Sequence, residues 1–268
     1  MMLKERLTLL IVSCDKFSDL WDGHIKLFND NWQNRDFDTY IVTDKKTEKT
    51  FLDINIIAIE DKPEWTDRLK YALDYVKTDY VFITLDDYFL IEKVDNERMS
   101  SIMSLVTEDG IDYVRFFKRP TSATREPIER IPGLYRVETD SEYSVNLYPG
   151  IWKKDFLLFT LQQSLSAWKY EVALRRLAVN YGAKCIVDKG KGFVILDVVR
   201  KGKLLRTANR YFKKHPDIYL GNRELQGIGA ALKLWIKTVV IRYMPSRLRK
   251  TARKVYVAVG GTSFADYQ

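Results

Sequence analysis

The sequence predicts an α/β protein whose central sheet is mostly parallel and flanked by helices. Apolar runs of strand length alternate with segments of helical periodicity, an order typical of strand–helix–strand units. Two of the runs, Leu7–Cys14 and Tyr80–Leu85, are almost continuously apolar, as in strands covered on both faces. With 46% hydrophobic and 30% charged residues, the 268-residue chain has the composition of a folded protein and enough length for one large core.

Strands and helices alternate regularly through the first half of the chain. Residues with helical spacing follow the first strand from Asp15, a suitable helix cap, to Trp32, and Pro63 precedes another helix. We expect strands over 7–14, 37–43, 54–59, 80–85 and 111–117, and helices over 15–32, 65–76 and 96–106. Connections between the parallel strands should be right-handed.

The second half is less regular. A loop over 118–132, rich in Arg, Pro and Thr, precedes two short alternating segments, 134–137 and 143–147, which should pair as antiparallel strands. Helices are then expected over 154–163 and 167–180, and strands over 183–187 and 193–196 close the globular part.

Two adjacent acidic residues, Asp86 and Asp87, directly follow the apolar strand 80–85. Neighbouring anions repel each other, so such a pair at the end of a buried strand usually has a cation or a hydrogen-bonding ligand. In open α/β sheets, ligands bind beyond the carboxyl ends of the strands. The alternative interpretation is a turn, where Asp is common because it forms local hydrogen bonds.

The order of these segments resembles the GT-A fold glycosyltransferases of the bacterial surface-polysaccharide type, which use nucleotide-sugar donors. The resemblance extends from about Leu7 to about Leu205. It rests on 7–14, Ile41–Asp44, Trp65-x-x-Arg68, 80–90, Tyr148–Trp152 and Trp168–Glu171. It implies transfer of a sugar from a UDP-linked donor to a growing glycan, and the resemblance together with the C-terminal tail indicates that this glycan is linked to a lipid.

The resemblance also implies roles for individual residues. Donor binding falls to Asp15, Asp44, Arg68, Asp86 and Asp87, and Asp87 is also the residue expected to hold Mn²⁺ or Mg²⁺. Hard oxygen ligands favour these ions over zinc. The chain departs from the family's Asp-x-Asp element, because Tyr88 stands at the third position. Exposed cap or turn positions are the alternative for Asp15 and Asp44, and a solvated helix face for Arg68.

Glu171 is the predicted general base, since an inverting transferase needs a carboxylate within reach of the acceptor hydroxyl. Trp168 lies three residues earlier on the same predicted helix, and therefore on the same face. Trp152 and Trp168 are predicted to contact the acceptor. Core packing is the alternative for both tryptophans.

The chain has two cysteines and two histidines, all far apart, which gives neither a zinc pattern nor a disulfide framework. Cys14 and Cys185 lie in apolar runs and are expected to be buried thiols. His24 is expected to be structural and His215 exposed. There is no signal-peptide pattern and no uncharged apolar stretch of about 18 residues, so a cytoplasmic location is expected.

Residues 225–268 are predicted to form a basic, amphipathic helical tail that follows a catalytic domain over 1–224. Between Leu225 and Phe264 there are eight basic residues and no acidic one, and the rest of the chain is formally neutral. An apolar helical stripe runs along this tail: Ile228, Leu232, Trp235, Ile236, Val239, Val240 and Tyr243. Such a helix is typical of peripheral attachment to an anionic membrane, here its inner face. The alternative is a helix packed on the domain.

Two other functions are alternatives to glycosyl transfer. A nucleic-acid-binding protein could use the basic tail, but the globular part is formally neutral and has no recognition motif, so no nucleic-acid partner is expected. A nucleotidyltransferase shares the sheet type. It should carry a Gly-rich, basic phosphate loop after the first strand, and Ser13–Phe17 contains no glycine.

Overall fold

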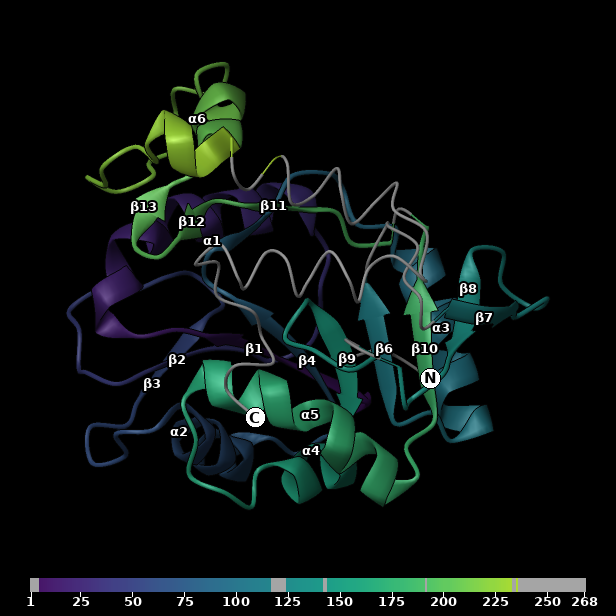
Figure 1. The fold of residues 1–268 in the computed structure, drawn as a ribbon. Helices are drawn as coiled ribbons and strands as arrows, with labels where there is room; N and C mark the ends of the chain where they lie inside the picture. The colour runs from purple at the N-terminus through teal and green to yellow at the C-terminus, as the bar shows by residue number, and fades with distance from the viewer. Residues whose placement is uncertain (1–4, 117–123, 142–143, 191, 233–234, 236–268) are drawn as a thin grey trace, which may run out of the picture. The chain divides into compact units, whose positions relative to one another are not determined.

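The computed structural model describes residues 5–116, 124–141, 144–190, 192–232 and 235 (Figure 1). The chain divides into two compact units. Unit 1 comprises Met1–Asp197 and Asp217–Gly221, and unit 2 comprises Val198–Pro216 and Asn222–Gln268. Unit 2 thus starts at Val198, whereas the charge pattern of the sequence predicted that the second part of the chain starts after residue 224.

Unit 1 is built on a sheet that has nine strands among the described residues, in the order β3-β2-β1-β4-β9-β6-β10-β8-β7. The strands are β1 (Leu7–Val12), β2 (Thr39–Thr43), β3 (Asn55–Ala58), β4 (Tyr80–Leu85), β6 (Tyr113–Phe116), β7 (Thr124–Pro127), β8 (Leu134–Val137), β9 (Gly150–Lys153) and β10 (Cys185–Asp188). Only β8 and β9 run against the others in this described sheet. The predicted class, a mostly parallel sheet flanked by helices, is therefore confirmed.

Helices cover both faces of this sheet, which explains why its central strands are apolar along their whole length. All six residues of β1 are buried. Leu7, Leu9 and Ile11 pack in the same core as α1 (Trp21–Asn31) and α3 (Asn96–Asp109). Leu10 and Val12 pack in the core formed with α2 (Trp65–Ala72), α4 (Lys154–Thr160) and α5 (Ala167–Tyr181). Each strand thus stabilises two cores.

Four expectations for unit 1 need correction. Residues 15–20 form a 3₁₀ helix before α1, and no side chain caps it, so Asp15 is not a helix cap. The expected pairing of 134–137 with 143–147 is wrong: β8 pairs with β10 and β7, and the described residues 144–147 are not a strand. The predicted loop 118–132 contains β7. The strand expected over 193–196 is present but shifted: it is β11 (Ile195–Asp197), which pairs with β5 (Tyr88–Leu90) outside the main sheet.

The carboxyl ends of β1, β2, β4, β6 and β10 lie at one edge of the sheet, because these strands run in the same direction. Helix α2 follows β3 in the chain and so begins near this edge. The backbone amide of Thr66 donates to the Leu165 carbonyl (3.1 Å), and its hydroxyl donates to Gln163 (2.8 Å). These bonds fix the start of α5 beside the start of α2, at the same edge.

Unit 2 contains a hairpin of β12 (Val199–Arg200) and β13 (Lys203–Leu204), followed by α6 (Arg206–Phe212). Residues 228–232 and 235 are helical, as the tail prediction requires of them. The later members of the predicted stripe, from Ile236 to Tyr243, lie outside the described residues. Across the described chain, no helix combines the length and hydropathy needed to cross a membrane.

Candidate functional site

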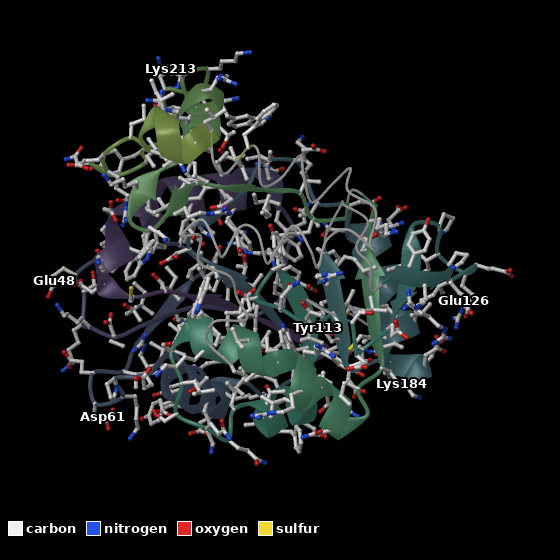
Figure 2. The ribbon with its side chains drawn as sticks, viewed as in Figure 1. Glu48, Asp61, Tyr113, Glu126, Lys184 and Lys213 are labelled. Atoms are coloured by element: carbon white, nitrogen blue, oxygen red, sulfur yellow. The ribbon has the colours of Figure 1, made fainter. Side chains whose placement is uncertain are left out.

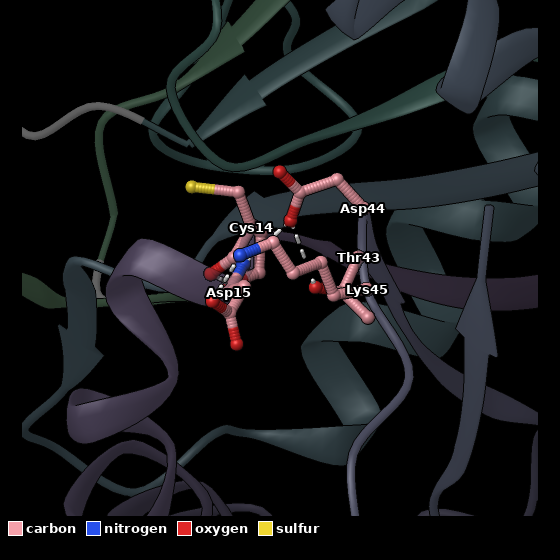
Figure 3. Close-up of polar contacts among 6 residues, drawn as sticks. Cys14, Asp15, Thr43, Asp44 and Lys45 are labelled. Carbon is pink, nitrogen blue, oxygen red and sulfur yellow. Dashed lines mark hydrogen bonds and ion pairs between the residues drawn. The ribbon is translucent and has the colours of Figure 1, made fainter. Parts of the chain in front are cut away.

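The segments that follow β1 and β2 bring Asp15 and Asp44 together (Figure 3), and both residues are predicted to contact the donor. The backbone amide of Asp15 donates to Asp44 Oδ1 at 2.6 Å. Lys45 Nζ lies 3.2 Å from Asp15 Oδ2, and both of these side chains are largely exposed. The Asp15 amide fixes one oxygen of the Asp44 carboxylate, which therefore has a defined orientation at the carboxyl edge.

Asp86, which directly follows β4, is buried with only 6% of its surface exposed. Its carboxylate accepts a hydrogen bond from the Ser13 hydroxyl, and Trp21 Nε1 donates to Ser13 Oγ at 2.7 Å. The chain Trp21–Ser13–Asp86 links the 3₁₀-to-α1 junction, the end of β1 and the end of β4. A charge-assisted bond of this kind stabilises an ionised carboxylate that burial would otherwise disfavour.

Arg68 lies on α2 and is buried with 7% exposed, so the interpretation as a solvated helix face is wrong. Its Nη1 donates to the carbonyls of Lys62 (3.2 Å) and Pro63 (2.8 Å), and its buried Nε has no hydrogen-bond partner among the described residues. Cys14 lies within electrostatic range of this guanidinium. Its pKa is raised by burial and by the carboxylates of Asp86 and Asp44, and Arg68 opposes this rise.

The two predicted buried thiols differ. Cys14 is only partly buried, which corrects the expectation for it, whereas Cys185 is buried in the core and burial raises its pKa to about 12. Cys14 is thus the accessible thiol of the pair, and it stands beside the predicted donor carboxylates.

Asp87 lies next to a pair of tyrosines that come from distant parts of the chain. The rings of Tyr88 and Tyr148 are stacked, with centroids 5.3 Å apart and planes at 14°. The pKa of Tyr88 is raised well above its usual value by burial and then by the negative charge of Asp87, with smaller contributions from Tyr148, Asp197 and Glu171. Asp197 ends β11 and pairs with Tyr88 in the strand register. Three carboxylates therefore lie within electrostatic range of one tyrosine.

Glu171 reaches this cluster from the second turn of α5. Its Oε1 accepts a hydrogen bond from the backbone amide of Leu147 at 3.4 Å. Burial raises the pKa of the Glu171 carboxyl, and this bond opposes the rise. The structure brings the predicted base and Asp87 to the same tyrosine pair, although the two residues are 84 positions apart in the sequence.

The two predicted acceptor tryptophans have different environments. Trp168 is 47% exposed at the start of α5, as a residue in contact with an acceptor requires. Trp152 is fully buried in β9, with its ring 4.5 Å from Tyr113 and 5.8 Å from Phe156. Figure 2 shows Tyr113 inside unit 1. Trp152 therefore belongs to the core, and its placement does not support a role in an acceptor cleft.

One residue that the sequence analysis missed is Arg115, near the end of β6. It is fully buried, and its Nη1 donates to the carbonyl of Ser144 at 3.4 Å. Burial lowers the pKa of Arg115, and the hydroxyls of Tyr113 and Tyr148 lie within electrostatic range. The available signal was a basic residue in the middle of the strand-like run 111–117, which contains one other charge, Asp112. Arg115 adds a buried positive charge to the carboxyl edge.

A metal ion would find limited protein ligands here. Among the described residues, no three His, Cys, Asp or Glu side chains come close enough to form a complete metal site. Asp87, the predicted metal ligand, would supply a single carboxylate. This arrangement fits Mg²⁺ or Mn²⁺ held by one carboxylate together with substrate phosphates, because Mg²⁺ usually binds in that way.

No family model matches the sequence, and no curated protein is significantly similar to it. Solved structures are similar at the level of the fold. A UDP-glucose pyrophosphorylase complexed with UDP-glucose matches with a TM-score of 0.50 and 10% identity, over 80% of this chain and 100% of that chain.

Two further matches are weaker. S. aureus TarS 1–349 in complex with UDP-GlcNAc matches with a TM-score of 0.48 and 10% identity, over 74% of this chain and 60% of that one. The bifunctional IspDF from Campylobacter jejuni matches with a TM-score of 0.43 and 14% identity, over 72% of this chain and 52% of that one. The chain spans about three fifths of the TarS 1–349 structure. At such identities the likeness concerns architecture alone, and it agrees with a GT-A-like α/β fold.

Proposed function

We propose that the protein is a glycosyltransferase that moves a sugar from a nucleotide-sugar donor to a hydroxyl of an acceptor glycan. The observation that supports this most is the meeting of Asp87 and Glu171 at the Tyr88–Tyr148 pair, on the sheet edge where Asp15, Asp44 and Arg68 also lie. Donor-binding groups and a carboxylate base are the two parts that such a transfer needs.

The donor is proposed to lie along the ends of β1, β2 and β4. The nucleoside would contact Asp15 and Asp44. The diphosphate would approach Arg68, whose buried Nε has no hydrogen-bond partner in the described chain and whose planar guanidinium suits phosphate oxygens. We propose a uridine nucleotide, because the pyrophosphorylase structure that shares the fold contains UDP-glucose.

Asp87 would hold Mg²⁺ or Mn²⁺ against the diphosphate, and this ion would stabilise the negative charge of the departing nucleotide. The chain's own residues would do the rest. Asp86 stays fixed by Ser13 and keeps the end of β4 in place, and Arg68 orients the phosphates. Tyr88 and Tyr148 would contribute a stacked aromatic wall to the site.

In the transfer step, the acceptor oxygen forms a bond to the anomeric carbon while the bond from that carbon to the diphosphate breaks. Glu171 takes the hydroxyl proton. Its raised pKa suits this role, since a general base works best when its pKa approaches the working pH. Trp168, exposed one turn earlier, would support a sugar ring.

Nucleotidyl transfer is the rival reaction on this fold. It requires cationic and backbone donors around a triphosphate after the first strand, but here the Asp15 backbone amide is taken up by the Asp44 carboxylate, and the Asp15 carboxylate lies there too, paired with Lys45. Their negative charge disfavours a triphosphate at this point. We therefore favour glycosyl transfer, with a lipid-linked surface glycan as acceptor and the cytoplasmic face of the membrane as location.

The test is nucleotide release from a panel of UDP-, GDP-, CMP- and dTDP-sugars by the full chain. We expect UDP from a UDP-sugar, and no UTP when pyrophosphate is added. Asp87→Asn should abolish release. Asp155→Asn is the matched control, because α4 follows the antiparallel β9 and begins at the opposite edge of the sheet. UTP formation would identify a nucleotidyltransferase, and equal rates in both variants would refute the site.

Donor binding has an independent readout in Cys14. A maleimide should label this partly exposed thiol, whereas the buried Cys185 should not react in the folded protein. Because Cys14 lies beside Asp44 and Asp86, a bound UDP-sugar should slow its labelling. A Cys14→Ser protein is the control for label at other positions. Labelling at the same rate with and without any nucleotide would place the donor elsewhere.

A further inference from the structure

Charge is divided unequally between the two units. The chain has 44 basic and 36 acidic residues. Unit 2 contains 16 of the basic and two of the acidic residues, so unit 1 has 28 basic and 34 acidic residues. The excess is not confined to the tail: between Val198 and Pro216 there are seven Lys and Arg residues and no Asp or Glu. Unit 2 is therefore strongly positive, and unit 1 is negative.

Helix α6 concentrates part of this charge on one side. Arg206, Arg210 and Lys213 recur at helical spacing and line an open hollow together with Asn209. Lys213, labelled in Figure 2, directly follows the last residue of α6 and is exposed. Arg206 is held in place, because its Nε donates to the Gln226 carbonyl at 2.8 Å.

A second group of unit 2 residues exposes large apolar side chains. Ile228, Leu232 and Trp235 are 72%, 53% and 62% exposed. Their spacing of four and three residues in the helical segment places them on one face. Exposing three large apolar side chains on one face of a helix marks an interaction surface rather than ordinary surface variation.

The basic and the apolar groups are connected within unit 2. The backbone of Leu204 exchanges bonds with the segment that leads into the helix: its amide donates to Glu224 (2.9 Å), and its carbonyl accepts from Gln226 (2.8 Å). The Arg206 side chain adds a third bond to that segment. The start of α6 and the start of the apolar helix are thus joined.

We propose that unit 2 docks on the surface of an anionic lipid bilayer. The apolar face formed by Ile228, Leu232 and Trp235 would enter the headgroup region, and Arg210 and Lys213 would contact anionic headgroups. A nucleic acid would satisfy the cations, but it would give Ile228 and Leu232 no apolar partner. The sequence beyond the described residues continues with further cations up to Lys254 and no acid before Asp266. This proposal does not depend on the proposed function of unit 1.

Co-sedimentation of the full chain with vesicles tests the proposal. Vesicles of phosphatidylcholine with phosphatidylglycerol should bind the protein, and vesicles of phosphatidylcholine alone should bind it far less. Each headgroup contact by a cation is worth about a fivefold factor in binding. Arg210→Gln with Lys213→Gln should therefore weaken binding about 25-fold, and rising salt should weaken that of the unmodified protein.

Two controls match these changes in unit 1. Lys70→Gln with Lys77→Gln removes two exposed cations there, and Leu52→Ser removes a side chain that is 81% exposed. Both should bind vesicles normally, whereas Ile228→Ser with Leu232→Ser should not. The proposal is overturned if the unit 2 variants bind like these controls, or if the unmodified protein ignores anionic vesicles. Binding to single-stranded RNA but not to vesicles would assign unit 2 to nucleic acid.

Discussion

Acidification below pH 6.5 should destabilise unit 1 through the imidazole of His24. This side chain lies on α1, is 1% exposed, and packs against the rings of Phe28 and Phe89. Neither ring nitrogen makes a hydrogen bond of good geometry in the described structure, and the backbone of Asp86 only partly opposes the effect of burial on the pKa. Burial lowers the pKa of His24 from 6.5 to about 4, because the protonated form cannot be solvated there.

The direction of the effect follows from which state binds the proton more readily. The unfolded chain takes up a proton on His24 near pH 6.5, whereas the folded protein does so only near pH 4. His24 therefore does not lower the free energy of unfolding above pH 6.5. As the pH falls from 6.5 to about 4, protonation of the unfolded chain lowers this free energy progressively. At ~1.4 kcal/mol per pKa unit, the full loss in the free energy of unfolding is about 3 kcal/mol.

Urea unfolding at pH 7.5 and at pH 4.5 measures this loss. Other groups also titrate in this range, so the quantity to compare is the difference between proteins. His24→Phe retains an aromatic ring and removes the ionisable group, and it should lose less stability on acidification than the unmodified protein. His215→Phe, which removes the exposed histidine, should lose as much as the unmodified protein. The reasoning is refuted if all three proteins show the same pH dependence.

Other variants test the carboxyl edge. Ser13→Ala should lower the free energy of unfolding by about 1.5–3 kcal/mol, the usual contribution of a hydrogen bond to a charged group. Ser13→Thr keeps the hydroxyl and is the control. If urea unfolds both variants equally readily, the bond between Ser13 and Asp86 is contradicted. Glu171→Gln should lower kcat by roughly 10²–10⁴-fold, with Glu126→Gln as the unaffected control. The same Glu171→Gln change should raise stability near neutral pH, because the raised pKa makes the ionised carboxyl costly when folded, and this gain should vanish below the unfolded pKa. EDTA should abolish UDP release if Asp87 holds a metal, and Mn²⁺ or Mg²⁺ should restore it; full activity in EDTA would show that basic groups do that work.

The strands that were predicted well are those buried on both faces. Leu7–Val12 and Tyr80–Leu85 have little polar interruption, so their apolar runs identify them without any knowledge of their neighbours. The prediction of a strand over 143–147 was wrong for its described residues 144–147, and the reason is related. Val145 and Leu147 are buried, as alternation suggested, but they pack as an irregular segment on the core that contains α4 and α5. Burial can be inferred from such a pattern, whereas hydrogen-bond pairing depends on distant residues.

The site was predictable where chemistry is concentrated in a short segment. Asp86 and Asp87 stand out beside an apolar strand, and the sequence alone places them at the ligand edge. The stack of Tyr88 on Tyr148 joins residues 60 positions apart, and nothing local indicates it. Trp152 was assigned to the acceptor through the resemblance, whereas its burial depends on Tyr113, a residue 39 positions earlier in the chain.

The insertion of β9 between β4 and β6 sets an order for folding. Both neighbours precede β9 in the chain, and Gly150 fits between them because a Cβ there would lie 2.6 Å from the Val114 carbonyl oxygen. The other edge of β6 likewise remains unpaired until β10, which follows later in the chain, has been synthesised. A nascent chain that ends near residue 147 would expose unpaired edges of β4 and β6 to other chains. Ribosome-bound chains of that length should recruit chaperones, and protection of those β4 amides that bond to β9, unlike those that bond to β1, should begin only after β9 has emerged.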